Sequence, residues 1–267
     1  MPGPSTVGAG VVSPRLLVPF AAMSASYFAH IGFFNPYLSL WLKDLGYSVG
    51  VIGLLISFQA LTRLYSPYAW GWLSDRTGHR VKLLRISAGI SLFCSLGLAY
   101  QGGLGWMVLV LLLMFTHTSA MMPMSEAAMA HLVSQGGHLD VRRYGRIRLW
   151  GSLGFLLTVL SAGWWFDHRG MQDFPVWTWA TLALVNLSVW LMPQVKEPQG
   201  EHATQPPIWV EVKRPHNRWF FTAMFFHVLT HVAIYSFYSL YLDSLGYSKA
   251  MIGSLWALSV AAEVVGF

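Results

Sequence analysis

Apolar residues occur in long blocks along the chain, and short polar segments separate most of these blocks. A bilayer core about 30 Å thick needs about 20 mostly apolar residues for each helix that crosses it. The pattern predicts eight such helices, at residues 16–42, 49–70, 83–101, 104–134, 149–166, 176–193, 219–242 and 249–267. We therefore expect an all-α, polytopic membrane protein.

One connection, residues 194–218, is longer than the others. It mixes charged residues with Pro198, Pro206, Pro207 and Pro215, and such a segment cannot form one continuous helix. The chain is therefore expected to divide into three parts. These are a six-helix N-terminal transmembrane bundle at 1–193, a cytoplasmic linker at 194–218 and the start of a C-terminal transmembrane bundle at 219–267.

The composition excludes several classes of protein. Charged residues make up only 10% of the chain and the mean hydropathy is +0.49, whereas about a quarter of a soluble domain is charged. In so apolar a chain, the net charge of +6 indicates basic membrane loops, and no nucleic-acid partner is expected. Cys94 is the single cysteine, and no catalytic or metal-ligand pattern occurs, so we expect no enzyme activity, cofactor or metal site.

The basic residues predict the orientation, because cytoplasmic loops are enriched in lysine and arginine. With a cytoplasmic N-terminus, that side carries thirteen: Arg15, Arg76, Arg80, Lys82, Arg85, Arg142, Arg143, Arg146, Arg148, Lys196, Lys213, Arg214 and Arg218. The other side carries three, Lys43, Arg169 and Lys249, and Arg63 lies inside a span. We expect a multi-pass protein of the cell inner (cytoplasmic) membrane with its N-terminus and linker in the cytoplasm.

An internal repeat appears at an offset of two hundred residues. The segment from Ser39 to Ser48 resembles the segment from Ser239 to Ser248, and Ile52-Gly53 recurs as Ile252-Gly253. Identities at one fixed offset favour a duplication over a chance likeness of two hairpins. The second copy extends only to the equivalent of Pro67, so we expect a truncated chain that lacks roughly four helices of a two-bundle transporter.

Residues 71–80, with the sequence GWLSDRTGHR, form the 71–80 motif. A positive-inside loop explains Arg76 and Arg80 but not the spaced Gly71, Asp75 and Gly78. The motif resembles the loop between spans two and three of the major facilitator superfamily, although His79 departs from the base found there. We expect Gly71 to allow close helix approach, Gly78 a tight turn and Asp75 charge-assisted hydrogen bonds that rearrange during transport.

A second group of residues combines an acid and a base inside predicted spans. If the hairpin turns near Gly136 and Gly137, Glu126 and Arg148 lie at similar depth. A single charge there costs about 2.5 to 3.5 kcal/mol or more, and pairing reduces that cost. The pair is either part of a substrate site or a structural ion pair, and Arg148 can also extend to lipid headgroups.

The stretch from Tyr144 to Gly151, with the acid in span four, looks like the phenylpropionate-permease and lactose-permease branch of the superfamily. That resemblance implies substrate-binding roles for Glu126 and Arg148, and it places Glu263 at the acid of span eight. A carboxylate in an apolar helix can exchange a proton, as symport requires. The repeat puts Glu263 opposite Arg63, which suggests a pair across the cavity, but Glu263 also lies close to the end of the chain.

The histidines support no specific site. His227 and His231 share one helix face, as metal ligands can, but no third ligand follows, so a polar stripe facing the cavity is expected. His30 and His117 are either cavity residues or hydrogen-bonded interior residues.

Together these features predict a secondary active transporter that moves a small organic solute with protons by alternating access. Its partners are the solute, protons and the lipid bilayer, and a monomer is expected. An aromatic acid such as phenylpropionate, a sugar and a nucleoside remain open as substrates. The alternatives are a sensor or scaffold of the same fold that does not transport, and an inactive truncated form.

Overall fold

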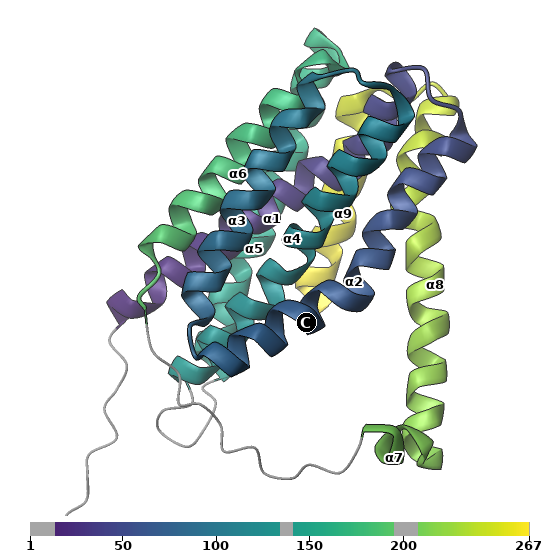
Figure 1. Ribbon diagram of the computed structural model, residues 1–267. Helices are drawn as coiled ribbons and strands as arrows, with labels where there is room; N and C mark the ends of the chain where they lie inside the picture. The colour runs from purple at the N-terminus through teal and green to yellow at the C-terminus, as the bar shows by residue number, and fades with distance from the viewer. Residues whose placement is uncertain (1–13, 134–140, 195–207, 267) are drawn as a thin grey trace, which may run out of the picture.

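The computed structural model describes residues 14–133, 141–194 and 208–266, which form a bundle of long helices (Figure 1). The long helices are α1 (Pro14–Asp44), α2 (Val49–Thr77), α3 (Arg80–Ser95), α4 (Gly103–Val133), α5 (Val141–Arg169), α6 (Phe174–Leu191), α8 (Pro215–Ser244) and α9 (Lys249–Gly266). Short helical turns are η1 (Leu96–Ala99), η2 (Met171–Asp173) and α7 (Ile208–Lys213). Within these described residues, eight helices are long and apolar enough to cross a membrane, which confirms the predicted all-α membrane fold.

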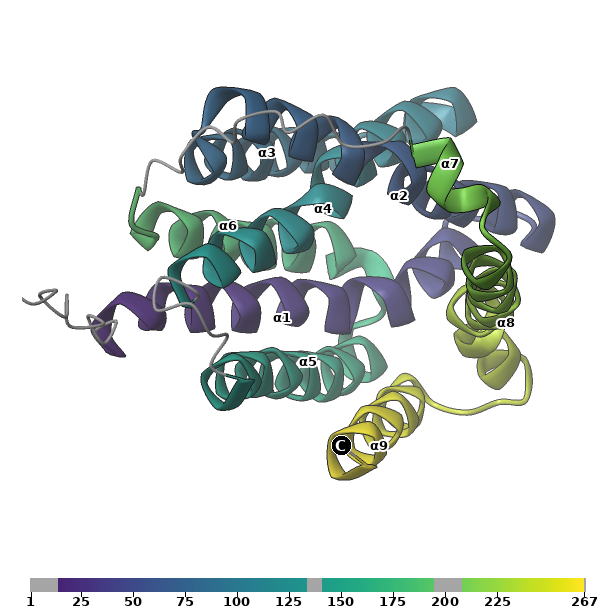
Figure 2. The same ribbon diagram turned by 90° about the horizontal axis from the view of Figure 1, so that it is seen from below.

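Helix α1 lies at the centre of the first bundle. Seen from below, it runs between α5 and α6, while α2 and α3 both contact α4 (Figure 2). Helix α9 packs mainly against α5, and α8 contacts α1 and α2. The two helices that begin the second copy of the repeat are thus attached to the first bundle along α5, α1 and α2.

Glycine residues allow α1 and α5 to approach closely. A Cβ atom on Gly154 would overlap the carbonyl oxygen of Ala25, and one on Gly32 would lie 2.7 Å from the carbonyl oxygen of Phe155. Small residues at such crossings let helix backbones meet inside a membrane. The relative position of α1 and α5, which both carry residues of the candidate site, is therefore fixed by backbone contact.

The internal repeat is also visible in the structure. The turns after α1 and α8 both contain a glycine with a left-handed backbone, Gly46 with φ of +87° and Gly246 with φ of +83°. In each turn the next residue donates its N–H to a leucine carbonyl at 3.1 Å, from Tyr47 in one copy and Tyr247 in the other. The repeated residues therefore form the same local structure twice.

Several helix boundaries differ from the predicted ones, among them the start of α5 at Val141 instead of residue 149. Helix α2 continues to Thr77, so most of the 71–80 motif is helical and only Gly78 and His79 form the turn. Helix α8 begins at Pro215, because a proline at the first position of a helix loses no hydrogen bond. Helix α7 and the first turn of α8 lie within the predicted linker. Residues 195–207 of that linker, and the expected turn at 136–137, lie outside the described residues.

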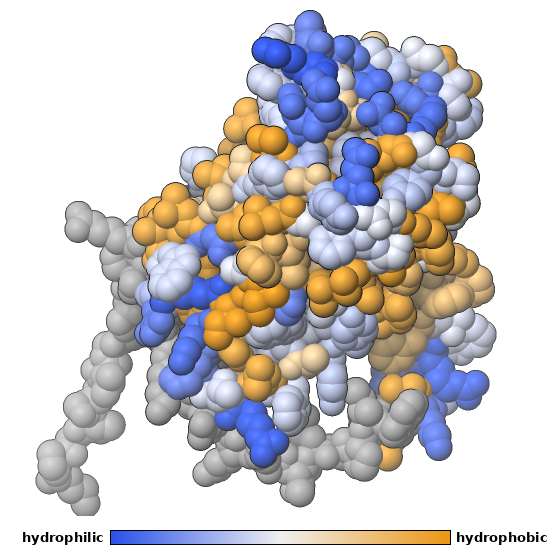
Figure 3. Space-filling model, turned by 45° about the horizontal axis from the view of Figure 1, so that its top comes forward, coloured by the Kyte–Doolittle hydropathy of each residue, from blue (hydrophilic) through white to orange (hydrophobic). Residues whose placement is uncertain are grey.

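The surface matches a protein surrounded by lipid. Hydrophilic residues gather at the two ends of the bundle, and a hydrophobic band lies between them (Figure 3). Large apolar side chains such as Leu64, Phe93 and Leu157 are more than two-thirds exposed in that region. Such extensive apolar exposure is unfavourable in water and is expected where acyl chains cover the protein.

Candidate functional site

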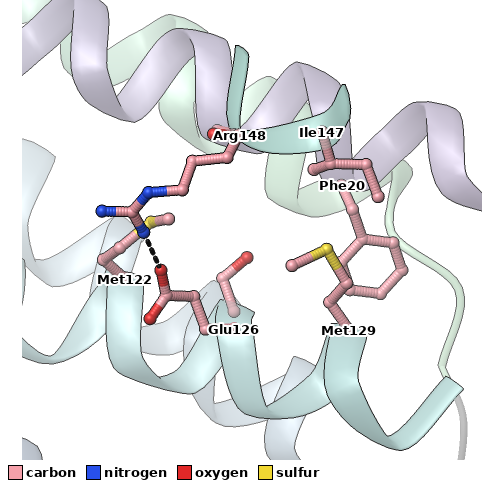
Figure 4. Close-up of a pocket in the computed structure, with 8 residues that line it drawn as sticks. Phe20, Met122, Glu126, Met129, Ile147 and Arg148 are labelled. Atoms are coloured by element: carbon pink, nitrogen blue, oxygen red, sulfur yellow. Dashed lines mark hydrogen bonds and ion pairs between the residues drawn. The ribbon is translucent and has the colours of Figure 1, made fainter. Parts of the chain in front are cut away.

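Glu126 and Arg148 form an ion pair, with 2.8 Å between Oε1 and Nη1 (Figure 4). Glu126 lies seven residues before the end of α4, and Arg148 lies seven residues after the start of α5. At 1.5 Å per residue both are about 10 Å from their helix ends, which explains why they meet. The predicted pairing is present, and both side chains keep part of their surface open: 33% for Glu126 and 55% for Arg148.

The ion pair borders a hollow that we call the Glu126–Arg148 pocket. Its lining comes from three helices: Phe20 and Ser24 of α1, Met122, Ser125, Glu126 and Met129 of α4, and Ile147 and Arg148 of α5. Figure 4 shows Met122 beside the pair and Phe20, Met129 and Ile147 on the opposite side of the hollow. The pocket therefore combines an apolar wall with one acid and one base.

Four of the lining residues were not predicted from the sequence: Phe20, Ser24, Met122 and Met129. A signal for them exists, because Met122, Glu126 and Met129 follow one another at the spacing of one helix face. Phe20 and Ser24 show the same spacing on α1. That periodicity alone, however, does not say which face of α1 meets which face of α4.

A further basic residue contributes to the electrostatics of this region. The hydroxyl group of Tyr27 in α1 donates to the Thr118 carbonyl at 3.4 Å. The charges of Arg63 and Glu126 both act electrostatically on that hydroxyl group. Arg63 belongs to α2. Charges on α2 and α4 thus both act on Tyr27 of α1.

Glu263 is exposed on α9. Its charge and that of Arg63 both act on Tyr235 of α8. Among the described residues no ion pair joins Arg63 to Glu263, so the suggested pair across the cavity is not formed in this conformation. The reason is geometric. Arg63 lies on α2 and Glu263 lies on α9, whereas the helix of the second copy that contacts α2 is α8.

The 71–80 motif forms the end of α2 and the turn into α3. Asp75 pairs with Arg80 at 2.8 Å, and Arg76 lies over the ring of Trp72 at 5.3 Å. Gly78 has φ of +67° and donates its N–H to the Ser74 carbonyl, which ends α2. The tight turn at Gly78 and the hydrogen bond to Asp75 match the expectations.

Gly71 is different, and the expectation of close helix approach there is wrong for this conformation. Within the described part of the chain, nothing lies within 4 Å of the position that its Cβ would take.

The histidines separate into two kinds. His30 is buried, with 3.0 Å between its Nδ1 and the Thr181 hydroxyl, and its ring packs at a tilt against Phe34 with centroids 5.0 Å apart, so it is an interior residue. His117 packs edge-on against Trp70 at 5.5 Å. His227 and His231 are exposed, with their rings 4.3 Å apart, and among the described residues they belong to no group of three metal-ligating side chains.

Comparison with known proteins identifies the family. Residues 22–267 match the family described as MFS_1 like family. The chain belongs to this family. The major facilitator resemblance drawn from the 71–80 motif is confirmed.

Two curated relatives of this family illustrate its range. The chain is 28% identical over 255 residues to an Escherichia coli (strain K12) protein named "Probable 3-phenylpropionic acid transporter", covering 91% of this chain and 63% of that protein. It is 33% identical over 143 residues to the maltose permease of Geobacillus stearothermophilus, covering 53% of this chain and 35% of the permease. The chain thus spans less than two thirds of the length of these relatives.

A solved structure supports the fold. The crystal structure of the nucleoside transporter NupG matches with a TM-score of 0.62 at 17% sequence identity, covering 80% of this chain and 52% of that one. At this identity the match establishes the major facilitator arrangement of the helices alone.

Proposed function

We propose that this chain is part of a secondary transporter that binds a small organic acid at the Glu126–Arg148 pocket and carries it across the cytoplasmic membrane. The observation that supports this most directly is the ion pair of Glu126 and Arg148 within two apolar helices, beside a pocket and with both side chains partly exposed. An arginine in this position can bind a carboxylate through two parallel hydrogen bonds.

The exposure of the pair favours binding over a structural role. A structural ion pair in a membrane is expected to be enclosed, because charges there are costly unless their remaining hydrogen-bonding groups are satisfied. More than half of the Arg148 side-chain surface remains open. That surface leaves room for a solute carboxylate to share the guanidinium with Glu126.

The lining of the pocket suggests the rest of the solute. Phe20, Met122 and Ile147 offer an apolar surface for a ring next to the charged pair. One relative bears the name of a 3-phenylpropionic acid transporter. An aromatic monocarboxylate therefore fits the chemistry of the site, and we propose this class as the substrate.

We further propose that Glu263 couples transport to protons. It is a carboxylate on a membrane-spanning helix, and its charge acts on Tyr235 together with that of Arg63. Uptake of 3-phenylpropionate into proteoliposomes driven by a proton gradient should be lost in Glu263→Gln, while binding is retained. Undiminished gradient-driven uptake by Glu263→Gln would contradict the coupling role.

The proposed orientation follows from the basic residues. The N-terminal end of α1, the turn at Gly78 and helix α7 lie at one end of the bundle (Figure 1). We propose that this end faces the cytoplasm. We also propose that residues 1–193 act as one bundle, that 194–218 link it to a second bundle starting at 219, and that the protein works as a monomer.

Binding provides the first test. Calorimetry with the purified chain in detergent should detect 3-phenylpropionate, and Arg148→Gln should weaken its affinity roughly tenfold or more, as expected when a charged hydrogen-bond partner is removed. Arg146→Gln removes an exposed arginine from the same helix and is the matched control. Equal affinities of wild type and Arg148→Gln would refute the site, and binding without uptake in proteoliposomes would favour a sensor.

A further inference from the structure

Arg63 places a positive charge at the middle of a membrane-spanning helix. Helix α2 runs from Val49 to Thr77, so Arg63 lies 14 residues from each end, about 21 Å at 1.5 Å per residue. An arginine side chain is far shorter than this distance, so the guanidinium cannot extend to the lipid headgroups as one near a helix end does. An ionisable group at this depth indicates a function.

The charge of Arg63 has no direct partner in the described part of the chain. Its guanidinium forms neither a hydrogen bond nor an ion pair with the residues described, and its side chain is exposed. Arg148, by contrast, is paired with Glu126. The donors of Arg63 are therefore available to an anion from outside the chain.

Arg63 lies on the face of α2 that is turned toward other helices. Ile52, Ile56 and Gln59 precede it on that face at helical spacing. Ile52 and Ile56 are buried, and Gln59 donates to Asn35 of α1 at 3.1 Å. The exposed apolar residues on the opposite side of α2, where lipid is expected, are Leu54, Leu61 and Tyr68. Arg63 thus faces the protein interior and not the lipid.

The interior space beside Arg63 lies between the first bundle and α8. A Cβ atom on Gly53 would lie 3.0 Å from the Phe237 ring, so α2 and α8 touch ten residues before Arg63. Tyr235, near this contact on α8, is 47% exposed. The charge of Arg63 acts on Tyr235 and also on Tyr27 of α1. Arg63 therefore borders an open space that both copies of the repeat surround.

The depths of Arg63 and Arg148 set the length of a solute that could contact both. Helix α2 begins and α5 ends at the same end of the bundle (Figure 1). Arg63 lies 14 residues from that end and Arg148 lies 21, so they differ in depth by about 10 Å. A ring with one carboxylate attached directly and another on a short side chain has a comparable length.

We propose that Arg63 is a second anion-binding residue, so that the carrier prefers aromatic acids with two carboxylates over those with one. One carboxylate binds Arg148, and the other binds the Arg63 guanidinium through two parallel hydrogen bonds. A monocarboxylate at Arg148 leaves the charge of Arg63 uncompensated, whereas a dicarboxylate neutralises it. The inference rests on the proposed function, because one carboxylate must bind at Arg148.

The test compares three ligands by calorimetry on the purified chain in detergent. These are 3-phenylpropionate, its para-carboxylated analogue, and the methyl ester of that para carboxylate, which is similar in size but lacks the second charge. We expect the diacid, but not the ester, to bind the wild type roughly tenfold or more tightly than 3-phenylpropionate, as a charged hydrogen-bond partner provides. Arg63→Gln should lose this preference and keep its affinity for 3-phenylpropionate.

The matched control is Arg146→Gln, which removes an exposed arginine of α5 by the same substitution and should keep the preference. An equal loss in Arg146→Gln would show a general attraction of basic residues for the diacid and would refute the role of Arg63. If Arg63→Gln does not fold, Arg63→Lys keeps the charge but loses the paired donors. The preference for the diacid should fall in Arg63→Lys, and an unchanged preference contradicts the proposal.

The outcomes separate the two proposals. If the wild type binds 3-phenylpropionate but does not favour the diacid over the ester, or if Arg63→Gln retains the preference, the role of Arg63 is refuted while the site at Arg148 stands. If the wild type binds none of the three ligands, the proposed function fails and the role of Arg63 fails with it.

Discussion

Lys43 and Asp243 occupy equivalent positions in the two copies of the repeat, 200 residues apart, and they form an ion pair with 2.7 Å between Nζ and Oδ2. Lys249 Nζ lies 3.8 Å from the other oxygen of Asp243, and Asp167 accepts a hydrogen bond from the Lys249 backbone N–H at 3.0 Å. These contacts join α1 and α5 to α8 and α9 at the end of the bundle away from the 71–80 motif (Figure 1). The two copies are therefore held together at that end in this conformation.

The first prediction concerns the strength of this ion pair. Lys43 is half exposed, and exposed pairs contribute about 0.2 to 1 kcal/mol to stability. A double-mutant cycle of Lys43→Met and Asp243→Asn, followed by thermal unfolding in detergent, should give a coupling energy in this range that falls with added salt. Strictly additive effects would show that the two residues do not interact in solution.

A second prediction concerns Tyr37, whose hydroxyl lies 3.0 Å from the Val159 carbonyl and 3.2 Å from the Lys249 carbonyl. It thereby connects α1 to α5 and to the start of α9. Tyr37→Phe should reduce the free energy of unfolding by about 1 kcal/mol, since buried carbonyls lose their donor. Tyr238→Phe is the control, because the Tyr238 hydroxyl makes no hydrogen bond within the described ranges. An equal loss of unfolding free energy in both variants would contradict the stabilising role of the Tyr37 hydroxyl.

The third prediction tests the backbone contact between α1 and α5. Gly154→Ala should destabilise the bundle by about 1 to 3 kcal/mol, because the added methyl group would overlap the Ala25 carbonyl oxygen. Gly71→Ala should instead be neutral or stabilise by up to about 1 kcal/mol, because alanine favours the helix and the position is open. Thermal unfolding of both variants measures these changes in stability. Equal stabilities of the two variants would show that α1 and α5 lie further apart than in this structure.

The fourth prediction concerns Arg85 of α3, which holds the end of α6. Its guanidinium donates to the carbonyls of Val189, Trp190 and Met192, at 3.3, 3.1 and 2.8 Å, and it lies 5.0 Å from the centre of the Trp190 ring. Arg85→Ala should cost about 1.5 to 3 kcal/mol, the usual value for hydrogen bonds to a charged donor.

The control for Arg85 is Lys82→Ala, which removes an exposed cation from the same helix and should change stability by less than about 0.5 kcal/mol. Hydrogen exchange adds a local measurement. The last turn of α6 should exchange faster in Arg85→Ala, and unchanged protection there would show that Arg85 does not hold that turn.

Much of the fold follows from the sequence because helices that cross a membrane are determined locally. Every backbone polar group must be satisfied within its own segment, so the length of an apolar block predicts a helix without knowledge of its neighbours. The same holds for the turns at Gly46 and Gly246, whose left-handed backbone favours glycine in both copies. The pairing of Glu126 with Arg148 was also predictable, since depth along two helices of one hairpin depends only on residue count.

Other features depend on how the helices rotate and cross, and no local pattern contains that information. The open space at Gly71, the separation of Arg63 from Glu263 and the extension of α2 through the 71–80 motif became apparent only in three dimensions. The composition of the pocket is of this kind too, because Phe20 and Ser24 reach it through the crossing of α1 with α5. The sequence by itself determined the membrane-spanning helices, the repeat and the acid–base pair, which are set by apolar length and residue spacing. Only the tertiary structure decided which residues of α1 line the pocket beside that pair, because contact between distant helices depends on their rotation and close packing.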